Sequence, residues 1–255
     1  ALPIWLLRVP VVLHESDRVL GRANRFLLRF SQHFCIGTPQ KEIDDDKIMT
    51  HLGVPMTATG NPLRAKLLTG SKDGGRRVTG FSGKRPVLLV IGGSQGAQVL
   101  NEAVWKNLPA LVDLCDVVHL TGRGKANPSI THGRYWQRET MYDELHHLYA
   151  FADIVLSRAG AGVIAELSAL GKPTILVPLP DLAHRHQEEN AHFLQVANAV
   201  TVIRQDLLAE KLVPTVEELL QNDVQRRELG ERLHAFSDPD AADRIANILL
   251  AEAAK

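Results

Sequence analysis

An unbroken apolar run, a glycine-rich turn and a helical pattern follow one another in residues 87–101, VLLVIGGSQGAQVLN. Residues 87–91 are Val, Leu and Ile without polar alternation, which is typical of a strand buried on both faces of a parallel sheet. The glycines permit positive φ and close backbone approach, and the free amides of the following helix would point at the turn. The segment therefore predicts an anion site, in particular for a phosphate, where Ser94 could add a hydroxyl donor and Gln95 an amide.

Two other interpretations of this segment stay open at this stage. A strand, a glycine-rich turn and a helix also occur in α/β proteins for packing alone. Residues 92–96 furthermore spell G-x-S-x-G, the nucleophile elbow of α/β-hydrolases, in which Ser94 would attack an acyl carbon. Asp181 with His184 or His186 could then supply the acid and the His in the required order. A serine hydrolase is therefore a minor alternative.

Apolar segments and helical patterns alternate along the chain. We predict strands at 9–13, 34–37, 56–59, 87–91, 116–121, 154–157 and 174–178, and helices at 24–32, 97–106, 142–151, 162–170 and 187–197. The Gly, Ser, Lys and Arg composition of residues 69–84 indicates a hinge or linker. The alternation predicts an α/β fold with a doubly wound parallel sheet and right-handed crossovers.

The length of 255 residues suits one or two domains. The composition argues against several classes of function. Lys plus Arg and Asp plus Glu both number 29, and this zero net charge gives no support for nucleic-acid binding. The isolated Cys35 and Cys115 indicate neither a disulfide framework nor a zinc site. The apolar start is far shorter than the roughly 20 residues of a membrane span and lacks a signal-peptide cleavage site. A reducing cytoplasm is the expected compartment.

Polar residues follow several of the predicted strands, where loops converge on one edge of a parallel sheet. Glu166, in the first turns of the helix after Gly160, could accept two hydrogen bonds from a ribose diol, or it could be a solvated helix residue. Gln187 and Asn190, at i and i+3 on a helix face, carry amides that suit sugar hydroxyls. Neither His184 nor His186 has a carboxylate or Cys at ligand spacing, so we expect no metal site there.

Six strings together resemble the MurG family: HESDRVLGRANRFL, TGNPLR, VIGGSQGAQVLN, ADIVLSRAGAGVIAEL, GKPTILVPLP and HQEENA. The match runs from about residue 5 to the end, in order and in spacing. Members of this family are UDP-N-acetylglucosamine:lipid I N-acetylglucosaminyltransferases of GT-B fold, with two Rossmann-like domains. The resemblance implies that residues 1–60 belong to the N-terminal acceptor domain, 61–238 to the UDP-sugar-binding domain, and 239–255 to a helix that returns to the first domain.

The resemblance also implies a donor site. Arg64 and Ser94 match residues that hold the diphosphate, and Tyr142 falls where the family presents a backbone group to the uracil. Gln187 and Asn190 match residues that meet the N-acetylglucosamine. The loop and helix turn around the ribose, with Glu166 on the diol, match Ala161, Gly162, Val163, Ile164, Ala165 and Glu166.

Three departures from the family pattern bear on this site. Asp17 replaces an Asn that would touch the donor, and Val163 replaces a usual hydroxyl residue. The glycine-rich loop and the His that supply the family's proposed catalytic base have no counterpart, as roughly the first hundred residues of the pattern are missing. We therefore expect a truncated N-terminal domain and assign no catalytic base. His14 is only a weak candidate, because the family gives this His-Glu pair a structural place.

The function implied by the resemblance is inverting transfer of N-acetylglucosamine from UDP-N-acetylglucosamine to lipid I, forming lipid II for peptidoglycan. Helix-end amides and Arg64 would stabilise the departing diphosphate, so that neither a metal nor a cofactor is expected. The undecaprenyl-linked acceptor implies peripheral contact with the cytoplasmic face of the inner membrane. The alternative is a UDP-sugar-binding half that needs a separate subunit for catalysis.

Overall fold

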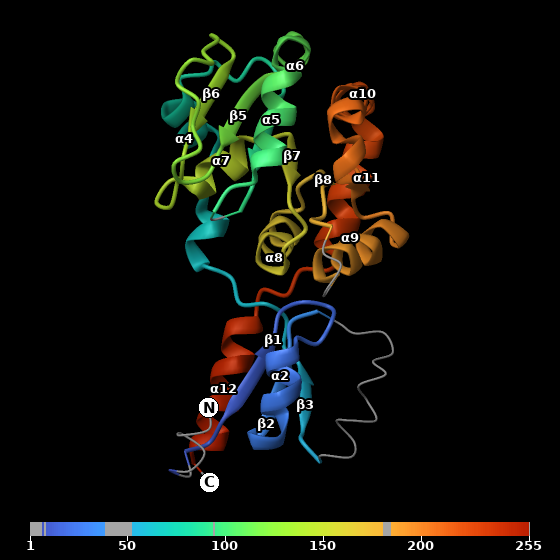
Figure 1. Cartoon of the computed structure of the whole chain (residues 1–255). Coiled ribbons are helices and arrows are strands. Elements are labelled where there is room, and N and C mark those ends of the chain that lie inside the picture. Colours follow the sequence, from blue (N-terminus) through green and yellow to red (C-terminus); the bar gives the residue numbers. More distant parts are fainter. Residues whose placement is uncertain (1–6, 8, 39–52, 94, 181–184, 255) are drawn as a thin grey trace.

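The computed structural model describes residues 7, 9–38, 53–93, 95–180 and 185–254. Within these residues, two parallel β-sheets lie at opposite ends of the molecule, and two stretches of chain connect them (Figure 1). These two stretches meet at Gly60 and Asp238: a Cβ on Gly60, whose φ is +80°, would lie 2.6 Å from the Cβ of Asp238. A side chain at position 60 would therefore be both strained and in collision with the second connection.

The smaller sheet has three parallel strands in the order β1-β2-β3. These strands are β1 (Val12–Glu15), β2 (His33–Ile36) and β3 (Met56–Ala58). Helix α2 (Arg22–Leu27) continues as the short 3-10 helix Leu28–Phe30, and helix α12 (Ala241–Ala253) packs against β2 (Figure 1). The predicted strand at 9–13 in fact begins at Val12, so that His14 and Glu15 belong to the strand itself.

The larger sheet has six parallel strands in the order β6-β5-β4-β7-β8-β9. Its strands are β4 (Val87–Ile91), β5 (Asp116–Leu120), β6 (Tyr135–Arg138), β7 (Ile154–Ser157), β8 (Thr174–Leu176) and β9 (Thr201–Val202). Because the chain moves outward in one direction from β4 and in the other from β7, the order reverses between these two strands. Ligands of doubly wound sheets bind at such a switch point, outside the carboxyl ends of the strands.

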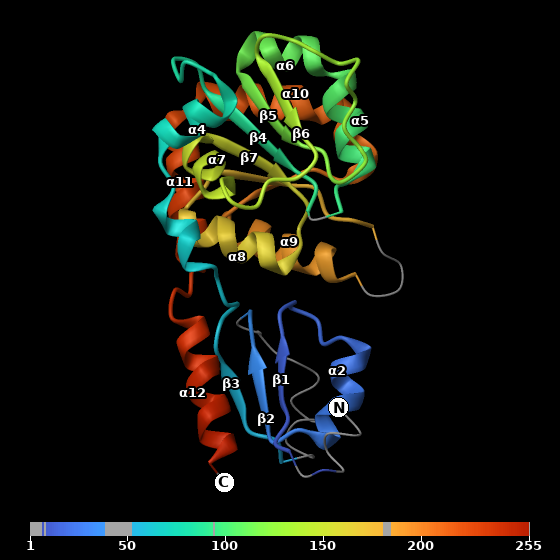
Figure 2. The same ribbon diagram turned by 90° about the vertical axis from the view of Figure 1, so that its left-hand side faces the viewer.

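Helices cover both faces of the larger sheet (Figure 2). The helices are α4 (Lys72–Thr79), α5 (Gln98–Lys106), α6 (Leu108–Leu114), α7 (Leu145–Phe151), α8 (Ala161–Leu170), α9 (His186–Val196), α10 (Leu208–Gln221) and α11 (Asp223–His234), with 3-10 turns at Ala65–Thr69 and Gln205–Leu207. Leu88 and Val90 of β4 face a core that includes α5, α6 and α10, whereas Leu89 and Ile91 face a core that includes α7, α8 and α9. This confirms the doubly wound α/β sheet and the strand buried on both faces.

The prediction of a hinge or linker at 69–84 was wrong, because residues 72–79 form helix α4. Ser71 caps its first turn by accepting a hydrogen bond from the Gly74 amide, and Gly80 ends it in the left-handed conformation. Positions 74 and 75 leave no room for a side chain, because α7 lies against them: a Cβ on Gly75 would lie 2.3 Å from the Cβ of Phe151. The glycines therefore serve close helix packing and not flexibility.

Several elements have no counterpart among the predicted ones, namely α6, β6, β9, α10 and α11. The strands β6 and β9 are the two edges of the larger sheet, and the helices α6, α10 and α11 add to its coverage, so these elements do not alter the architecture. Among the described residues, no helix is both long enough and apolar enough to cross a membrane.

Candidate functional site

A pocket of about 290 Å³ opens at the carboxyl edge of the larger sheet, at the switch point between β4 and β7. We call it the switch-point pocket. Its walls are mainly apolar, with a few polar groups, and its lining residues are Arg64, Ile91, Gly93, Leu120, Glu139, Thr140, Met141, Tyr142, Leu145, Tyr149, Gly162, Val163 and Glu166. An apolar pocket with few convergent polar groups is the usual form of a small-molecule site.

Both carboxylate oxygens of Glu166, in the wall of this pocket, accept a hydrogen bond. Its Oε1 accepts a hydrogen bond from the Arg64 guanidinium at 2.9 Å, and its Oε2 accepts one from the Tyr149 hydroxyl at 2.7 Å. The Glu166 side chain is only 19% exposed, whereas Arg64 is 55% exposed. Burial, followed by the negative charge of Glu166, raises the pKa of Tyr149 well above its ordinary value, so that this hydroxyl stays a donor.

The glycine-rich turn runs beside this pocket. Gly93 and Gly96 have φ values of +84° and +69°, as predicted for positive φ in this turn. A Cβ on Gly96 would lie 2.1 Å from the Thr121 carbonyl oxygen, so the turn after β4 touches the turn after β5. Gln95 is exposed on the turn, whereas Ser94 lies outside the described residues.

Helix α8 divides the six residues predicted around the ribose between two cavities. Gly162, Val163 and Glu166 line the switch-point pocket. Ala161, Ile164 and Ala165 line a smaller cavity of about 40 Å³ on the other side of α8, which we call the interdomain cavity. With 100° of rotation per residue, one helix cannot present six successive side chains to one ligand. These six residues therefore lie on two sides of α8.

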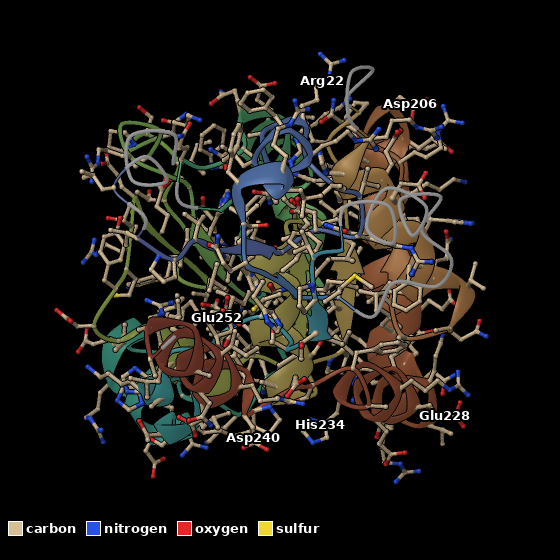
Figure 3. The ribbon with its side chains drawn as sticks, turned by 90° about the horizontal axis from the view of Figure 1, so that it is seen from below. Arg22, Asp206, Glu228, His234, Asp240 and Glu252 are labelled. Atoms are coloured by element: carbon tan, nitrogen blue, oxygen red, sulfur yellow. The ribbon has the colours of Figure 1, made fainter. Side chains whose placement is uncertain are left out.

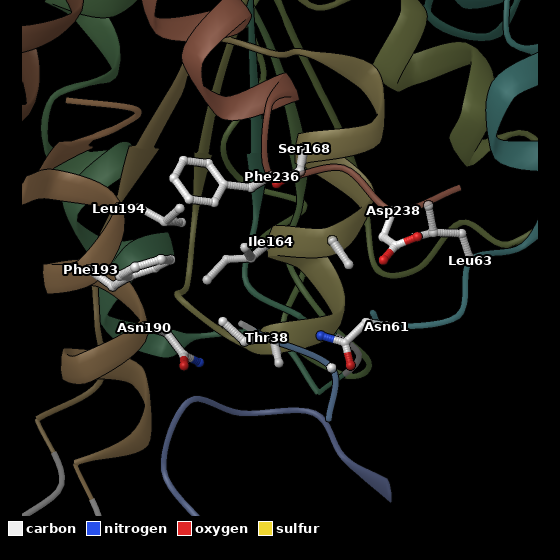
Figure 4. A pocket seen from close by; sticks show the side chains of 13 residues that line it. Thr38, Asn61, Leu63, Ile164, Ser168, Asn190, Phe193, Leu194, Phe236 and Asp238 are labelled. Atoms are coloured by element: carbon white, nitrogen blue, oxygen red, sulfur yellow. The ribbon is translucent and has the colours of Figure 1, made fainter. Parts of the chain in front are cut away.

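The interdomain cavity lies between the two sheets and their helices. Figure 4 shows Phe193, Leu194 and Phe236 on one side of it and Asn61 and Asp238 on the other, with Ile164 of α8 between them. Thr38 and Asn61 come from the part of the chain that carries the smaller sheet. The cavity is thus lined from both parts of the molecule.

Asn190 joins the two parts of the molecule directly. It is buried, and its Nδ2 donates to Asp17 Oδ1 at 2.8 Å and to the Ala159 carbonyl at 3.1 Å. Its Oδ1 accepts from the Arg18 amide at 3.1 Å, and the Arg18 guanidinium lies 4.0 Å from the centre of the Phe193 ring. Asn190 and Asp17, both predicted on the donor, are therefore bonded to each other in this structure.

Gln187 and His14 are also engaged by protein groups. Gln187 Oε1 accepts from the Leu179 amide at 3.1 Å and is not among the residues of either cavity. His14 has contacts at both ring nitrogens: Nε2 lies 3.1 Å from the Gly60 carbonyl and Nδ1 lies 3.3 Å from the Ser16 hydroxyl. Since a carbonyl can only accept, Nε2 carries the proton and Nδ1 accepts from Ser16.

Of the four residues of the hydrolase interpretation, the structure describes only His186. Ser94, Asp181 and His184 of the hydrolase interpretation all lie outside the described residues, and Nδ1 of His186 lies 4.0 Å from Asp17 Oδ2. Within the described part of the chain, no group of three or more His, Cys, Asp or Glu residues could hold a metal ion.

Sequence reasoning missed the Tyr149 hydroxyl and the loop that contributes Glu139, Thr140 and Met141 to the pocket. Tyr149 lies in a helix that was predicted, and a buried Tyr needs a partner for its hydroxyl, which is a signal that could have linked it to Glu166. The loop carries no comparable signal in its sequence. It follows directly on β6, and this strand was not predicted either.

The chain matches the family model described as the glycosyltransferase family 28 C-terminal domain over residues 87–245. It is 37% identical over 247 residues to the UDP-N-acetylglucosamine–N-acetylmuramyl-(pentapeptide) pyrophosphoryl-undecaprenol N-acetylglucosamine transferase of Lachnoclostridium phytofermentans, covering 95% of this chain and 66% of that protein. The protein of the same name from Legionella pneumophila strain Paris is 35% identical over 252 residues, with 98% and 67% covered. The chain thus spans about two thirds of the length of these relatives.

Solved structures agree with this at the level of the fold. Acinetobacter baumannii MurG superposes with a TM-score of 0.71 at 23% identity, covering 98% of this chain and 69% of that one. The S. aureus MnaA structure with UDP has a TM-score of 0.64 at 15% identity, covering 96% of this chain and 70% of that one.

Proposed function

The chain belongs to glycosyltransferase family 28, within the MurG family, and on that premise we propose that it binds UDP-N-acetylglucosamine for transfer of N-acetylglucosamine to lipid I. The product would be lipid II, the precursor used in peptidoglycan synthesis, and the activity would be that of a hexosyltransferase serving cell-wall biogenesis, cell shape and cell division. The observation that carries the proposal is the convergence of Arg64, Glu166 and Tyr149 on the switch-point pocket, beside the glycine-rich turn.

The proposed donor pose follows from the chemistry of this pocket. The uracil lies in its apolar part, near Met141 and Tyr142, and the ribose diol donates to the Glu166 carboxylate. The diphosphate lies at the glycine-rich turn, where Arg64 and the first amides of α5 provide donors and positive charge. Ser94 is proposed to add its hydroxyl there, and Gln95 its amide.

The proposed transfer proceeds with inversion at the anomeric carbon. A hydroxyl of the acceptor sugar attacks that carbon, its bond to the UDP oxygen breaks, and the hydroxyl proton passes to a base. Charge that develops on the departing diphosphate is stabilised by Arg64 and the helix-end amides. Both ring nitrogens of His14 already have protein partners, which supports a structural role for it. We assign the base to no described residue.

The N-acetylglucosamine is proposed to lie near α9, at Gln187 and Asn190. Asn190 is bonded to Asp17 and Arg18, so donor binding there requires that this contact rearrange. Domain movement around a bound substrate is a common way to achieve such an exchange. The Asp17 carboxylate would face the donor less favourably than an amide, because it can only accept hydrogen bonds.

We further propose a peripheral contact with an anionic membrane on the cytoplasmic side, through helix α2. This helix carries Arg22, Arg25 and the exposed Phe26, and the guanidinium of Arg29, in the 3-10 helix that follows, lies 4.8 Å from the centre of the Phe26 ring. Figure 3 shows Arg22 projecting at the margin of the molecule, viewed from the end of the smaller sheet. Basic side chains beside an exposed aromatic ring suit an anionic headgroup layer.

The second candidate function is a donor-binding half that transfers sugar only together with a separate chain. It is favoured by one observation: both ring nitrogens of His14 are engaged by protein groups.

A transfer assay with radiolabelled UDP-N-acetylglucosamine and a lipid I analogue tests both functions. We expect the donor to bind in either case. Labelled lipid II formed by the chain alone supports the first function, and formation only after addition of the N-terminal third of a relative supports the second. Absence of donor binding, or stoichiometric labelling of Ser94 by a fluorophosphonate probe, would contradict both.

A further inference from the structure

A buried hydrogen-bonded network lies behind the glycine-rich turn, away from the switch-point pocket. We call it the α5–β5–β6 network, and it consists of Asn101 and Trp105 of α5, His119 of β5 and Tyr135 of β6. His119 Nδ1 lies 2.9 Å from the Tyr135 hydroxyl and its Nε2 lies 3.0 Å from Asn101 Oδ1. Trp105 Nε1 donates to the Tyr135 hydroxyl at 2.8 Å, and Asn101 Nδ2 donates to the Thr121 carbonyl at 2.9 Å.

With a neutral His119, these bonds can be made in only one arrangement of protons, in which the Tyr135 hydroxyl donates to His119 and not to Gln137 Oε1, which lies farther away at 3.4 Å. The Thr121 carbonyl only accepts, so Asn101 turns its amide nitrogen to Thr121 and its oxygen to His119. His119 Nε2 must therefore carry the proton, which leaves Nδ1 to accept from the Tyr135 hydroxyl. The indole of Trp105 only donates, which fixes the Tyr135 oxygen as its acceptor. Asn101 and His119 are fully buried, so each of these groups would be costly to leave unpaired.

The network ends at the turn that supports the glycine-rich turn. The Thr121 carbonyl, which Asn101 holds, is the atom that a Cβ on Gly96 would meet at 2.1 Å. Gly122, with φ +93°, packs on Gly96 as well, since a Cβ there would lie 2.3 Å from the Gly96 Cα. Gly96 is two residues before α5, whose first amides face the proposed diphosphate position.

The same turn also holds the opposite wall of the switch-point pocket. The Thr121 amide donates to the Arg138 carbonyl at 2.9 Å, and the Gly122 amide donates to the Glu139 carbonyl at 2.8 Å. Glu139 begins the stretch that lines the pocket. A shift of Thr121 would therefore move the glycine-rich turn and this wall together.

We propose that Asn101 and His119 are positioning residues for the diphosphate of the donor. They hold the Thr121 carbonyl in place, and through it the backbone of Gly96 and the first amides of α5. The inference rests on the proposed function, because it takes the donor's diphosphate as the ligand of the glycine-rich turn. Tyr135 and Trp105, at the far end of the network, supply the partner of the remaining His119 nitrogen and do not touch the turn.

Two pairs of variants separate positioning from general stability. Asn101→Ala removes the bond to the Thr121 carbonyl, whereas Tyr135→Phe removes a hydroxyl from the same core at the far end of the network. His119→Leu cuts the network, whereas His119→Gln keeps a donor for Asn101 and an acceptor for the Tyr135 hydroxyl. If Asn101→Ala does not fold, the His119 pair still decides the matter.

Two measurements on the folded variants test the proposal: hydrogen exchange of the amides of residues 95–99, and the affinity for UDP by calorimetry. We expect Asn101→Ala and His119→Leu to speed that exchange and to weaken UDP binding by about tenfold or more. Tyr135→Phe and His119→Gln should retain nearly the exchange rates and affinity of the parent, even where the melting temperature falls.

Equal effects of Asn101→Ala and Tyr135→Phe at equal loss of stability would overturn the positioning role, as would unchanged exchange in Asn101→Ala. A parent chain that does not bind UDP would overturn the proposed function and the ligand named here. In that case the exchange rates still report whether Asn101 holds the glycine-rich turn, so the two failures are distinguishable.

Discussion

The guanidinium of Arg64 and the carboxylate of Glu166, 102 residues apart in sequence, lie 2.9 Å apart beside the switch-point pocket. The two residues are expected to bind different parts of one donor, Arg64 the diphosphate and Glu166 the ribose. Donor binding would therefore break the Arg64–Glu166 ion pair and replace it by one contact from each of the two residues to the donor. Arg64 is 55% exposed, and an exposed ion pair contributes only about 0–1 kcal/mol, so this exchange costs little.

Replacing Arg64 by Gln should weaken the binding of UDP but not that of uridine. The Arg64 side chain is proposed to contact the diphosphate, which uridine lacks. A hydrogen bond to a charged group contributes about 1.5–3 kcal/mol. We therefore expect roughly tenfold or greater loss for UDP. Calorimetric titrations of parent and variant with both ligands measure the difference, and an equal loss for uridine would show that Arg64 acts on the base or the ribose.

Replacing Asp17 by Asn should raise the affinity for UDP-N-acetylglucosamine. Asp17 Oδ1 accepts from Asn190 Nδ2, and an amide oxygen at the same place can still accept this bond. The substitution removes a negative charge from beside the proposed sugar position and adds a donor for a sugar hydroxyl. Competition against labelled UDP measures the change, with Asp17→Ala as a control that loses the bond to Asn190. An unchanged affinity in Asp17→Asn would place Asp17 away from the donor, and a lower affinity would show that its carboxylate favours binding.

Replacing Gly75 by Ala should destabilise the fold by about 1–3 kcal/mol, since overpacking displaces neighbouring atoms. A Cβ there would lie 2.3 Å from the Cβ of Phe151 and 2.9 Å from the His147 carbonyl. In a free helix the same change would stabilise by about 1 kcal/mol, so the expected sign is opposite to the helix propensity. Gly133→Ala is the matched control, because no atom within 4 Å would meet its Cβ. Thermal unfolding of the two variants distinguishes packing from a flexible linker.

The stability of the folded chain should fall with acid partly because of His119. Burial lowers the pKa of His119 to about 3, against an ordinary 6.5. Its contribution is fully present above pH 6.5 and is lost as the pH falls toward 3, because the unfolded chain takes up the proton first. At pH 5 the loss from this group is about 2 kcal/mol. Denaturant unfolding at pH 7 and pH 5 should show a smaller difference for His119→Gln than for the parent, and an equal difference would mean that His119 does not titrate in this way.

The central strands were predictable from sequence because burial on both faces leaves an unbroken apolar run. Residues 87–91 and 154–157 show this pattern, and both are strands with the predicted bounds. The edge strand β6, YWQR, has no apolar run, since it pairs with β5 alone and is partly exposed. Local periodicity therefore identifies the middle of the sheet and not its margins.

The misinterpretation of residues 69–84 has a different cause. Glycine serves both flexible linkers and close helix contacts, and only the partner helix distinguishes the two. Gly74 and Gly75 face α7, which begins some 70 residues later in the chain. A sequence pattern confined to the segment contains no information about that neighbour.

The candidate site could be predicted residue by residue only in part. Arg64, Tyr142 and Glu166 do line one pocket. Helical rotation turns Ala161, Ile164 and Ala165 away from it, and the bond between Asp17 and Asn190 depends on how the two parts of the chain meet. Helical periodicity could have predicted the direction of Ala161, Ile164 and Ala165. The Asp17–Asn190 bond is a tertiary contact, for which the local sequence carries no signal.

The assignment of the switch-point pocket is tested most directly by calorimetry of UDP and 2′-deoxyuridine diphosphate, on the parent and on Glu166→Ala. We expect the parent to bind UDP and to lose about tenfold or more in affinity when the 2′-hydroxyl is removed, because Glu166 accepts its hydrogen bond. Glu166→Ala should bind both ligands with the same, weaker affinity. A parent that does not bind UDP, or a Glu166→Ala variant that binds UDP as tightly as the parent does, would contradict the assignment of the switch-point pocket to a UDP-sugar donor.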